Sequence, residues 1–76
     1  MIELPKEPRL IGPALANLRK MLGVTQDELV ARGVGNQGVI SALENGHTMP
    51  LMVTVMAYLS ALGYKLGAFP DPKVEE

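Results

Sequence analysis

The stretch from Thr25 to Gly46, TQDELVARGVGNQGVISALENG, predicts two short helices joined by a glycine-rich turn at residues 33–35. Thr25 is suited to cap the first helix, because its hydroxyl can accept a backbone N–H that has no partner within the helix. Asn36 follows the turn and is suited to cap the second helix in the same way. That helix ends at Gly46, a frequent helix-stop residue. The sequence therefore predicts that two helices meet across a tight turn, with Val30 on the apolar face of the first helix and Val39 turned inward in the second.

Two more helices are predicted on either side of this pair. Apolar residues recur at helical spacing in residues 11–22, and Pro13 fits the first turn of that segment. Residues 50–62 are apolar on most sides of a helix, which indicates burial on more than one side. A strand is predicted for residues 64–69, paired with the same segment of a second subunit, because a lone strand is not stable. The predicted fold class is compact, all-α and four-helical, with a possible short C-terminal β-strand.

Length and composition limit the classes of protein. A chain of 76 residues has room for one domain, and its apolar content of 47% argues against disorder. No apolar run approaches the roughly 20 residues that span a bilayer. The absence of cysteine excludes a disulfide scaffold and a thiolate metal site. We expect an extended arm at residues 1–10, a domain at residues 11–69 and a disordered tail at residues 70–76.

The charge permits a nucleic-acid partner without demanding one. The whole chain has a net charge of −1, but residues 9–67 contain five basic and three acidic residues, a net charge of +2. There is no Ser-His-acid set that could form one site and no phosphate loop, so an enzyme is not predicted. No cofactor and no metal are predicted either, because His47 is the single histidine and lacks partners at ligand spacing.

Residues 13–66 resemble the lambda-repressor-like, or Xre-type, helix-turn-helix family of bacterial and phage regulators. The resemblance rests on Leu18-Arg19, Thr25-Gln26-Asp27-Glu28-Leu29, Val39-Ile40-Ser41, Leu43-Glu44-Asn45-Gly46, Pro50, Thr54 and Ala61-Leu62-Gly63. The chain departs from the family pattern at Val30, where alanine is usual, and at Val34, where glycine is usual. Because glycines flank Val34, the turn is expected to shift by one residue. The segment YKLGAF looks like the strand through which HipB-type antitoxins of this family dimerise.

The resemblance implies a sequence-specific DNA-binding transcriptional regulator, a cytoplasmic homodimeric repressor encoded by a bacterium or phage. Residues 25–46 would form the helix-turn-helix, with residues 36–44 in the major groove of an inverted-repeat operator, and residues 51–69 would form the dimer. Base contacts are implied for Asn36, Gln37, Gly38 and Ser41. Phosphate contacts are implied for Gln26, Asn45, His47 and Thr48, with Arg19 and Lys20 as further candidates. Dimer contacts are expected at Met56, Leu59, Tyr64, Leu66 and Phe69.

Alternatives stay open at several of these positions. Gln26 can equally be a solvated helix residue, whereas for Gln37 a base contact is favoured over a solvated position. The Ser41 hydroxyl can bond to its own helix. Arg19 is also the candidate partner of Glu44, which in this family's pattern is structural. The main rival function is a protein-binding module of the same fold, an antitoxin of a toxin–antitoxin pair or a phage antirepressor. A dimer that has kept the fold and lost the site is a third interpretation.

Overall fold

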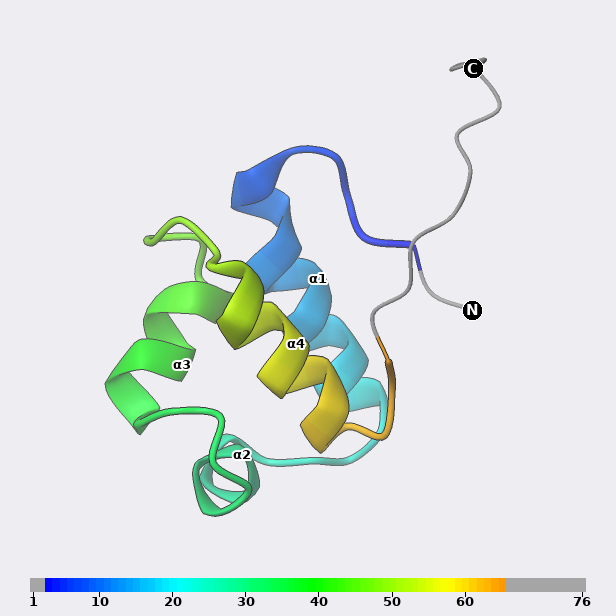
Figure 1. The fold of residues 1–76 in the computed structure, drawn as a ribbon, viewed down its shortest axis with the longest axis vertical. Helices are drawn as coiled ribbons and strands as arrows, with labels where there is room; N and C mark the ends of the chain where they lie inside the picture. The colour runs from blue at the N-terminus through cyan, green and yellow to red at the C-terminus, as the bar shows by residue number, and fades with distance from the viewer. Residues whose placement is uncertain (1–2, 66–76) are drawn as a thin grey trace.

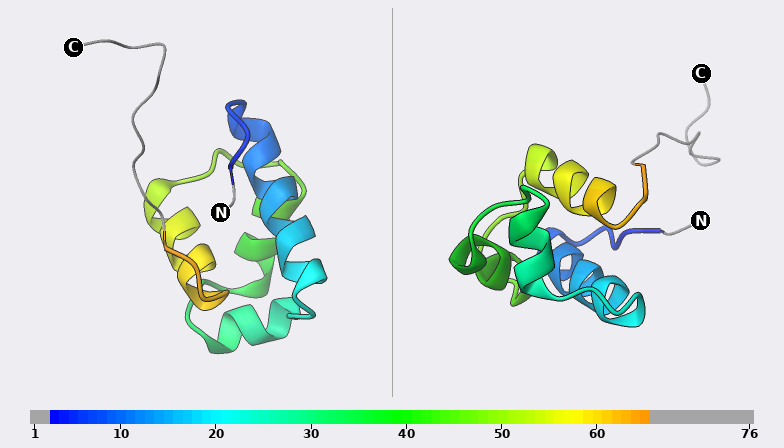
Figure 2. Two further views of the ribbon diagram at one scale, coloured as in Figure 1. Left: turned by 90° about the vertical axis from the view of Figure 1, so that its right-hand side faces the viewer. Right: turned by 90° about the horizontal axis from the view of Figure 1, so that it is seen from below.

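Four helices make up the fold of residues 3–65, the part of the chain that the computed structural model describes (Figure 1). They are α1 (Pro8–Met21), α2 (Gln26–Ala31), α3 (Gln37–Glu44) and α4 (Met52–Ala61). Helix α3 packs against both α1 and α2. Helix α4 lies in front of α1 in Figure 1, and the side view in Figure 2 separates these two helices, with α2 across one end. The predicted four-helix all-α fold is confirmed.

The core receives one fully buried side chain from each helix. These side chains are Leu15, Leu29, Ile40 and Tyr58. Burying a leucine or isoleucine side chain stabilises a fold by roughly 1.5–3 kcal/mol, so each helix is tied to the others mainly through this cluster. The orientation of α3 therefore depends on all three other helices.

Both predicted N-terminal caps are confirmed. The Thr25 hydroxyl accepts the backbone N–H of Glu28 at 3.1 Å, and the Glu28 carboxylate accepts the backbone N–H of Thr25 at 3.2 Å, which completes a capping box. The Asn36 side-chain oxygen accepts the backbone N–H of Val39 at 2.8 Å. These short-range bonds fix where α2 and α3 begin.

The turn between α2 and α3 depends on Gly33. Its φ is +85°, a conformation that strains other residues, and it follows the last turn of α2. The backbone N–H groups of Gly33 and Val34 donate to the carbonyls of Val30 and Leu29, the paired bonds of a Schellman motif. Val34 is consequently turned into the core beside Leu29. The left-handed residue thus precedes Val34, in agreement with the expected shift of one residue.

The bounds of two helices differ from the prediction. Helix α1 begins at Pro8 instead of residue 11, because a proline is accepted at the first helical position. The prediction that Pro13 lies in the first turn is therefore wrong, because Pro13 lies inside the helix. Helix α4 begins at Met52, after the N-cap Leu51, and not at Pro50.

Three apolar residues were placed wrongly by the sequence. Val30 and Val39 were expected to face inward, but they are 39% and 47% exposed. Leu59 was expected at a dimer interface, but it is buried in the core of its own subunit. In each case helical spacing identified the helix without fixing which edge of its apolar stripe the neighbouring helices would cover.

The end of the predicted strand lies outside the described residues, since the structure ends its description at residue 65. Tyr64 packs against the core, whereas the predicted interface residues Leu66 and Phe69 fall outside the described part. Within residues 3–65, no helix has the length and apolarity needed to cross a membrane.

Candidate nucleic-acid interface

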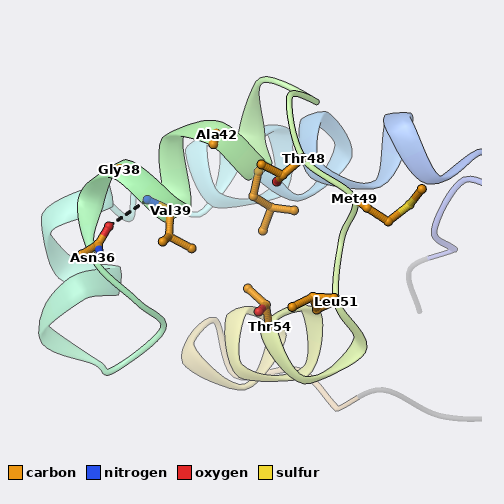
Figure 3. Close-up of a pocket in the computed structure, with 9 residues that line it drawn as sticks. Asn36, Gly38, Val39, Ala42, Thr48, Met49, Leu51 and Thr54 are labelled. Atoms are coloured by element: carbon orange, nitrogen blue, oxygen red, sulfur yellow. Dashed lines mark hydrogen bonds between the residues drawn. The ribbon is translucent and has the colours of Figure 1, made fainter.

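Helix α3 buries one side and exposes the other. Its buried residues are Ile40, Leu43 and Glu44, while Gln37, Gly38 and Val39 are exposed at its first turn. The exposed side begins directly after the capped N-terminus of the helix. Gly38, Val39, Ala42 and Leu43 of this helix, together with its N-cap Asn36, line one side of the groove in Figure 3.

The predicted base-contacting residues differ in how much hydrogen-bonding capacity they retain. Gln37 is exposed, and no neighbour within residues 3–65 hydrogen-bonds its side-chain amide. The Asn36 oxygen is occupied as the cap of α3, which leaves its NH₂ group for other partners. Ser41 is half-buried, and its hydroxyl accepts a hydrogen bond from the Asn45 amide at 3.3 Å. Gln37 therefore presents the most complete donor–acceptor pair on this surface.

A groove of about 450 Å³ runs between α3 and the segment that leads into α4 (Figure 3). Its lining residues are Asn36, Gly38, Val39, Ala42, Leu43, Thr48, Met49, Leu51 and Thr54. Sequence reasoning missed Val39 and Ala42 as surface residues here. The signal that could have found them is their spacing, since Val39 and Ala42 are three residues apart and share one side of the helix with Gly38. Apolar side chains on such a face can contact the methyl group of thymine, as an amide can pair with adenine.

Glu44 accepts hydrogen bonds from all three other helices. Arg19 on α1 donates from Nε and Nη2 at 2.8 and 2.9 Å, and Gln26 on α2 donates from its amide at 2.9 Å. The hydroxyl of Tyr58 on α4 also donates to Glu44. We call these four residues the Glu44 network. It confirms the expected pairing of Arg19 with Glu44 and leaves no buried side-chain nitrogen or oxygen of the described residues without a partner.

Two opposing effects set the pKa of the Glu44 carboxyl. Burial by itself would raise the pKa of this carboxyl, because a charge is poorly solvated inside a protein. Hydrogen bonds from Arg19, Tyr58 and Gln26 outweigh burial, so the pKa of Glu44 lies below its ordinary value. The bond to Glu44 raises the pKa of Arg19, and burial raises the pKa of Tyr58. At neutral pH the network is therefore a carboxylate, a guanidinium and a neutral phenol.

The Glu44 network rules out the predicted phosphate contact of Arg19 and limits the one predicted for Gln26. Arg19 is only 8% exposed, and its third guanidinium nitrogen donates to the carbonyl of Val24, so it is not available to a phosphate. The Gln26 side-chain nitrogen already donates to Glu44. The backbone N–H therefore remains as a donor that this residue can offer to a phosphate. Lys20, by contrast, is exposed in the last turn of α1.

The remaining predicted phosphate contacts lie together after α3. Asn45, His47 and Thr48 are all exposed in the turn that leads to α4. This turn begins with Gly46, whose φ is +74°. The structure therefore brings these three side chains to one end of α3, next to the groove of Figure 3.

Apolar residues also remain exposed on α4. Met52, Val53 and Met56 are 64%, 71% and 51% exposed, although Val55 and Leu59 of the same helix are buried. The prediction named Met56 for a dimer interface and missed Met52 and Val53 in that role. Spacing of three or four residues along a helix would have grouped all three.

The arrangement of α2, the Gly33 turn and α3 defines a helix-turn-helix protein. A family model described as "Helix-turn-helix" matches residues 15–69. The chain is also 38% identical over 55 residues to the HTH-type transcriptional regulator y4dJ of Sinorhizobium fredii (strain NBRC 101917 / NGR234). The aligned region covers 72% of this chain and 71% of the relative. No solved structure matches the chain. The chain belongs to the lambda-repressor-like, Xre-type helix-turn-helix family of DNA-binding transcriptional regulators.

Proposed function

We propose that this protein is a sequence-specific transcriptional repressor that binds an inverted-repeat operator as a homodimer. Helix α3 enters the major groove, with Gln37, Gly38 and the Asn36 amide against base edges. The observation that carries this proposal is the open side of α3, which presents an unengaged amide on a helix held by the core and by the Glu44 network. Half-sites would lie about one helical turn of DNA apart, as a two-fold dimer requires.

The exposed side of α4 supports the dimer. Met52, Val53 and Met56 form an apolar surface in the first half of α4. A second subunit that covered this surface would remove it from water, which is the main driving force for protein association. We therefore assign the subunit contact to these three residues in place of Leu59.

Selection from random duplex DNA tests the function directly. The full chain, shown beforehand to be folded, is mixed with a random library at moderate salt, and the bound duplexes are sequenced. Recovery of an inverted repeat is the expected result. A folded protein that enriches no sequence would contradict the proposed function.

Replacing Gln37 with alanine is expected to weaken operator binding by about 1–3 kcal/mol and to relax the preference at one base pair, because a bidentate amide–adenine contact is lost. Repeating the selection with the variant, and titrating the operator, measures both effects. Binding to a scrambled duplex serves as the control and should not change. Equal operator affinity and an unchanged sequence preference would remove Gln37 from the base-contacting set.

Replacing Gly38 with alanine is expected to change stability and DNA affinity in opposite directions. A Cβ at Gly38 meets only the Asn36 oxygen, at 3.4 Å, so the better helix propensity of alanine should stabilise the fold by up to about 1 kcal/mol. If α3 approaches the bases closely here, the added methyl should weaken operator binding by roughly tenfold. Thermal unfolding and operator titration measure the two effects.

The matched control for Gly38 is Asn17, an exposed residue within α1. Asn17→Ala should also stabilise its helix, by roughly 0.5 kcal/mol, and should leave operator affinity unchanged. Unchanged or tighter operator binding by Gly38→Ala would show that no base lies near this position.

A second candidate function is a protein-binding module, such as an antitoxin or an antirepressor. The same apolar surface of α4 favours this function, because a different protein can bury that surface as well as a second copy of this chain can. The dependence of DNA affinity on salt discriminates the two functions. Specific binding that weakens steeply with salt is expected of the repressor, and a flat dependence favours the protein partner.

A further inference from the structure

A cleft of about 250 Å³ lies between the first turn of α1 and the chain that follows α3. Its lining residues are Arg9, Gly46, His47, Thr48, Met49 and Pro50. Only Arg9 comes from α1, so the cleft joins segments that are far apart in the sequence. Its polar side chains carry a guanidinium, an imidazole and a hydroxyl, each of which can donate hydrogen bonds.

Two backbone features hold Arg9 beside this turn. Pro13 has no N–H, so the Arg9 carbonyl lacks the donor that a helix ordinarily supplies four residues later. Gly46 packs against that carbonyl so closely that a Cβ there would lie 3.0 Å from the Arg9 oxygen. The first turn of α1 thus meets the end of α3 through backbone atoms, and this contact does not need the Arg9 side chain.

The other arginines of the described chain serve different contacts. Arg19 belongs to the Glu44 network, and Arg32 donates to the carbonyl of Ala61 at 2.6 Å and pairs with Glu28 at 3.4 Å. The turn at residues 45–51 contains no lysine or arginine of its own. Within residues 3–65, Arg9 is therefore the guanidinium that the fold brings to this turn.

The cleft adjoins the surface of α3. Thr48 and Met49 line both the cleft and the larger groove in Figure 3, so the two hollows are contiguous. A duplex with base edges against α3 must carry its sugar-phosphate backbone across the neighbouring surface. A guanidinium suits a phosphate there, because it can donate two parallel hydrogen bonds and is always charged.

We propose that Arg9, together with Thr48 and His47, binds a phosphate group of the DNA backbone beside the major groove that α3 contacts. This inference rests on the proposed DNA-binding function and adds to it a residue outside the helix-turn-helix. The contact reads no base. It anchors the start of α1 to the DNA and sets the register of α3 along the groove.

The test compares Arg9→Gln with Lys65→Gln in the full chain. Both variants remove one positive charge, but Lys65 is exposed after the end of α4 and lies away from the cleft. Operator affinity is measured over a range of salt concentrations. Arg9→Gln should bind about tenfold more weakly than Lys65→Gln, and its salt dependence should fall by about 0.9 in logarithmic slope for each subunit bound.

Arg9→Lys provides a second variant, which keeps the charge and should keep most of the salt slope. Unfolding temperatures of all variants identify any loss of fold. Equal affinity and slope for Arg9→Gln and Lys65→Gln would overturn the inference while leaving the proposed function intact. A changed base preference with an unchanged slope would also overturn it, because Arg9 would then contact bases. Failure of the unaltered protein to select any DNA would overturn the proposed function and this inference together.

Discussion

Replacing Glu44 with alanine is expected to lower the free energy of unfolding by about 3–5 kcal/mol, which is the usual cost of breaking a buried ion pair from one side. The change would leave the Arg19 guanidinium buried without its counter-charge. It would also leave the Gln26 amide and the Tyr58 hydroxyl without their acceptor. All four helices are affected, because each supplies one member of the Glu44 network.

The size of this effect matters for so short a chain. At roughly 0.05–0.15 kcal/mol per residue, a domain of this length has only about 4–11 kcal/mol of total stability. The variant should therefore lose a large share of its total stability and unfold at a much lower urea concentration, as measured by urea unfolding followed by circular dichroism. The control is the double variant Arg19→Met/Glu44→Met, which removes both charges and should be less destabilised than Glu44→Ala alone. A single variant as stable as the unaltered protein would contradict the role given to the network.

The same measurement has a defined pH dependence. The folded protein holds the pKa of Glu44 below its ordinary value, so the unfolded chain takes up a proton at this site at higher pH than the folded one. The stability contributed by Glu44 is therefore present above the unfolded pKa and is lost as the pH falls through the folded pKa. The stability difference between the unaltered protein and Glu44→Gln should accordingly be largest at neutral pH and shrink in acid. A difference that stays constant from pH 7 to strong acid would contradict the lowered pKa.

Replacing Gly12 with alanine is expected to cost at least about 2 kcal/mol, because an added methyl would overlap the backbone where α1 crosses α3. A Cβ at Gly12 would lie 1.7 Å from the carbonyl oxygen of Leu43. No rotation of a side chain relieves this overlap, since the obstructing atom belongs to the backbone of α3. The two helices must move apart, and Leu15 and Ile40 then lose contact in the core.

The comparison with Gly38→Ala makes this prediction specific. Both changes give a helix a residue of better propensity, worth about 1 kcal/mol in each case. Only Gly12 is buried against another helix, so the two variants should shift the unfolding temperature in opposite directions. A stabilised Gly12→Ala would show that α1 and α3 are farther apart than the structure places them.

Short-range chemistry made much of the fold predictable. The caps at Thr25 and Asn36 need only atoms three residues away, and Gly33 and Gly46 end helices through bonds within six residues. Such contacts join residues that are close in the sequence, so the sequence alone can predict them. For the same reason Gln37 could be identified as an exposed residue at the start of α3.

The environment of a side chain, in contrast, was decided by the tertiary structure. Arg19 was a candidate both for a phosphate contact and for the pairing with Glu44, because the sequence shows its charge but does not decide which partner folding brings to it; the carboxylate comes from 25 residues away. Leu59 and Val39 have the same apolar character, yet neighbouring helices cover the first and leave the second open.

By itself, then, the sequence determined the four helices, their caps and stops, and the family resemblance, because these depend on local bonding and periodicity. Only the tertiary structure decided which polar groups remain available to DNA, which apolar faces stay uncovered and why Gly12 has no room for a side chain. The physical reason is that burial and pairing depend on atoms brought together from different helices, whose approach is set by the packing of the whole core.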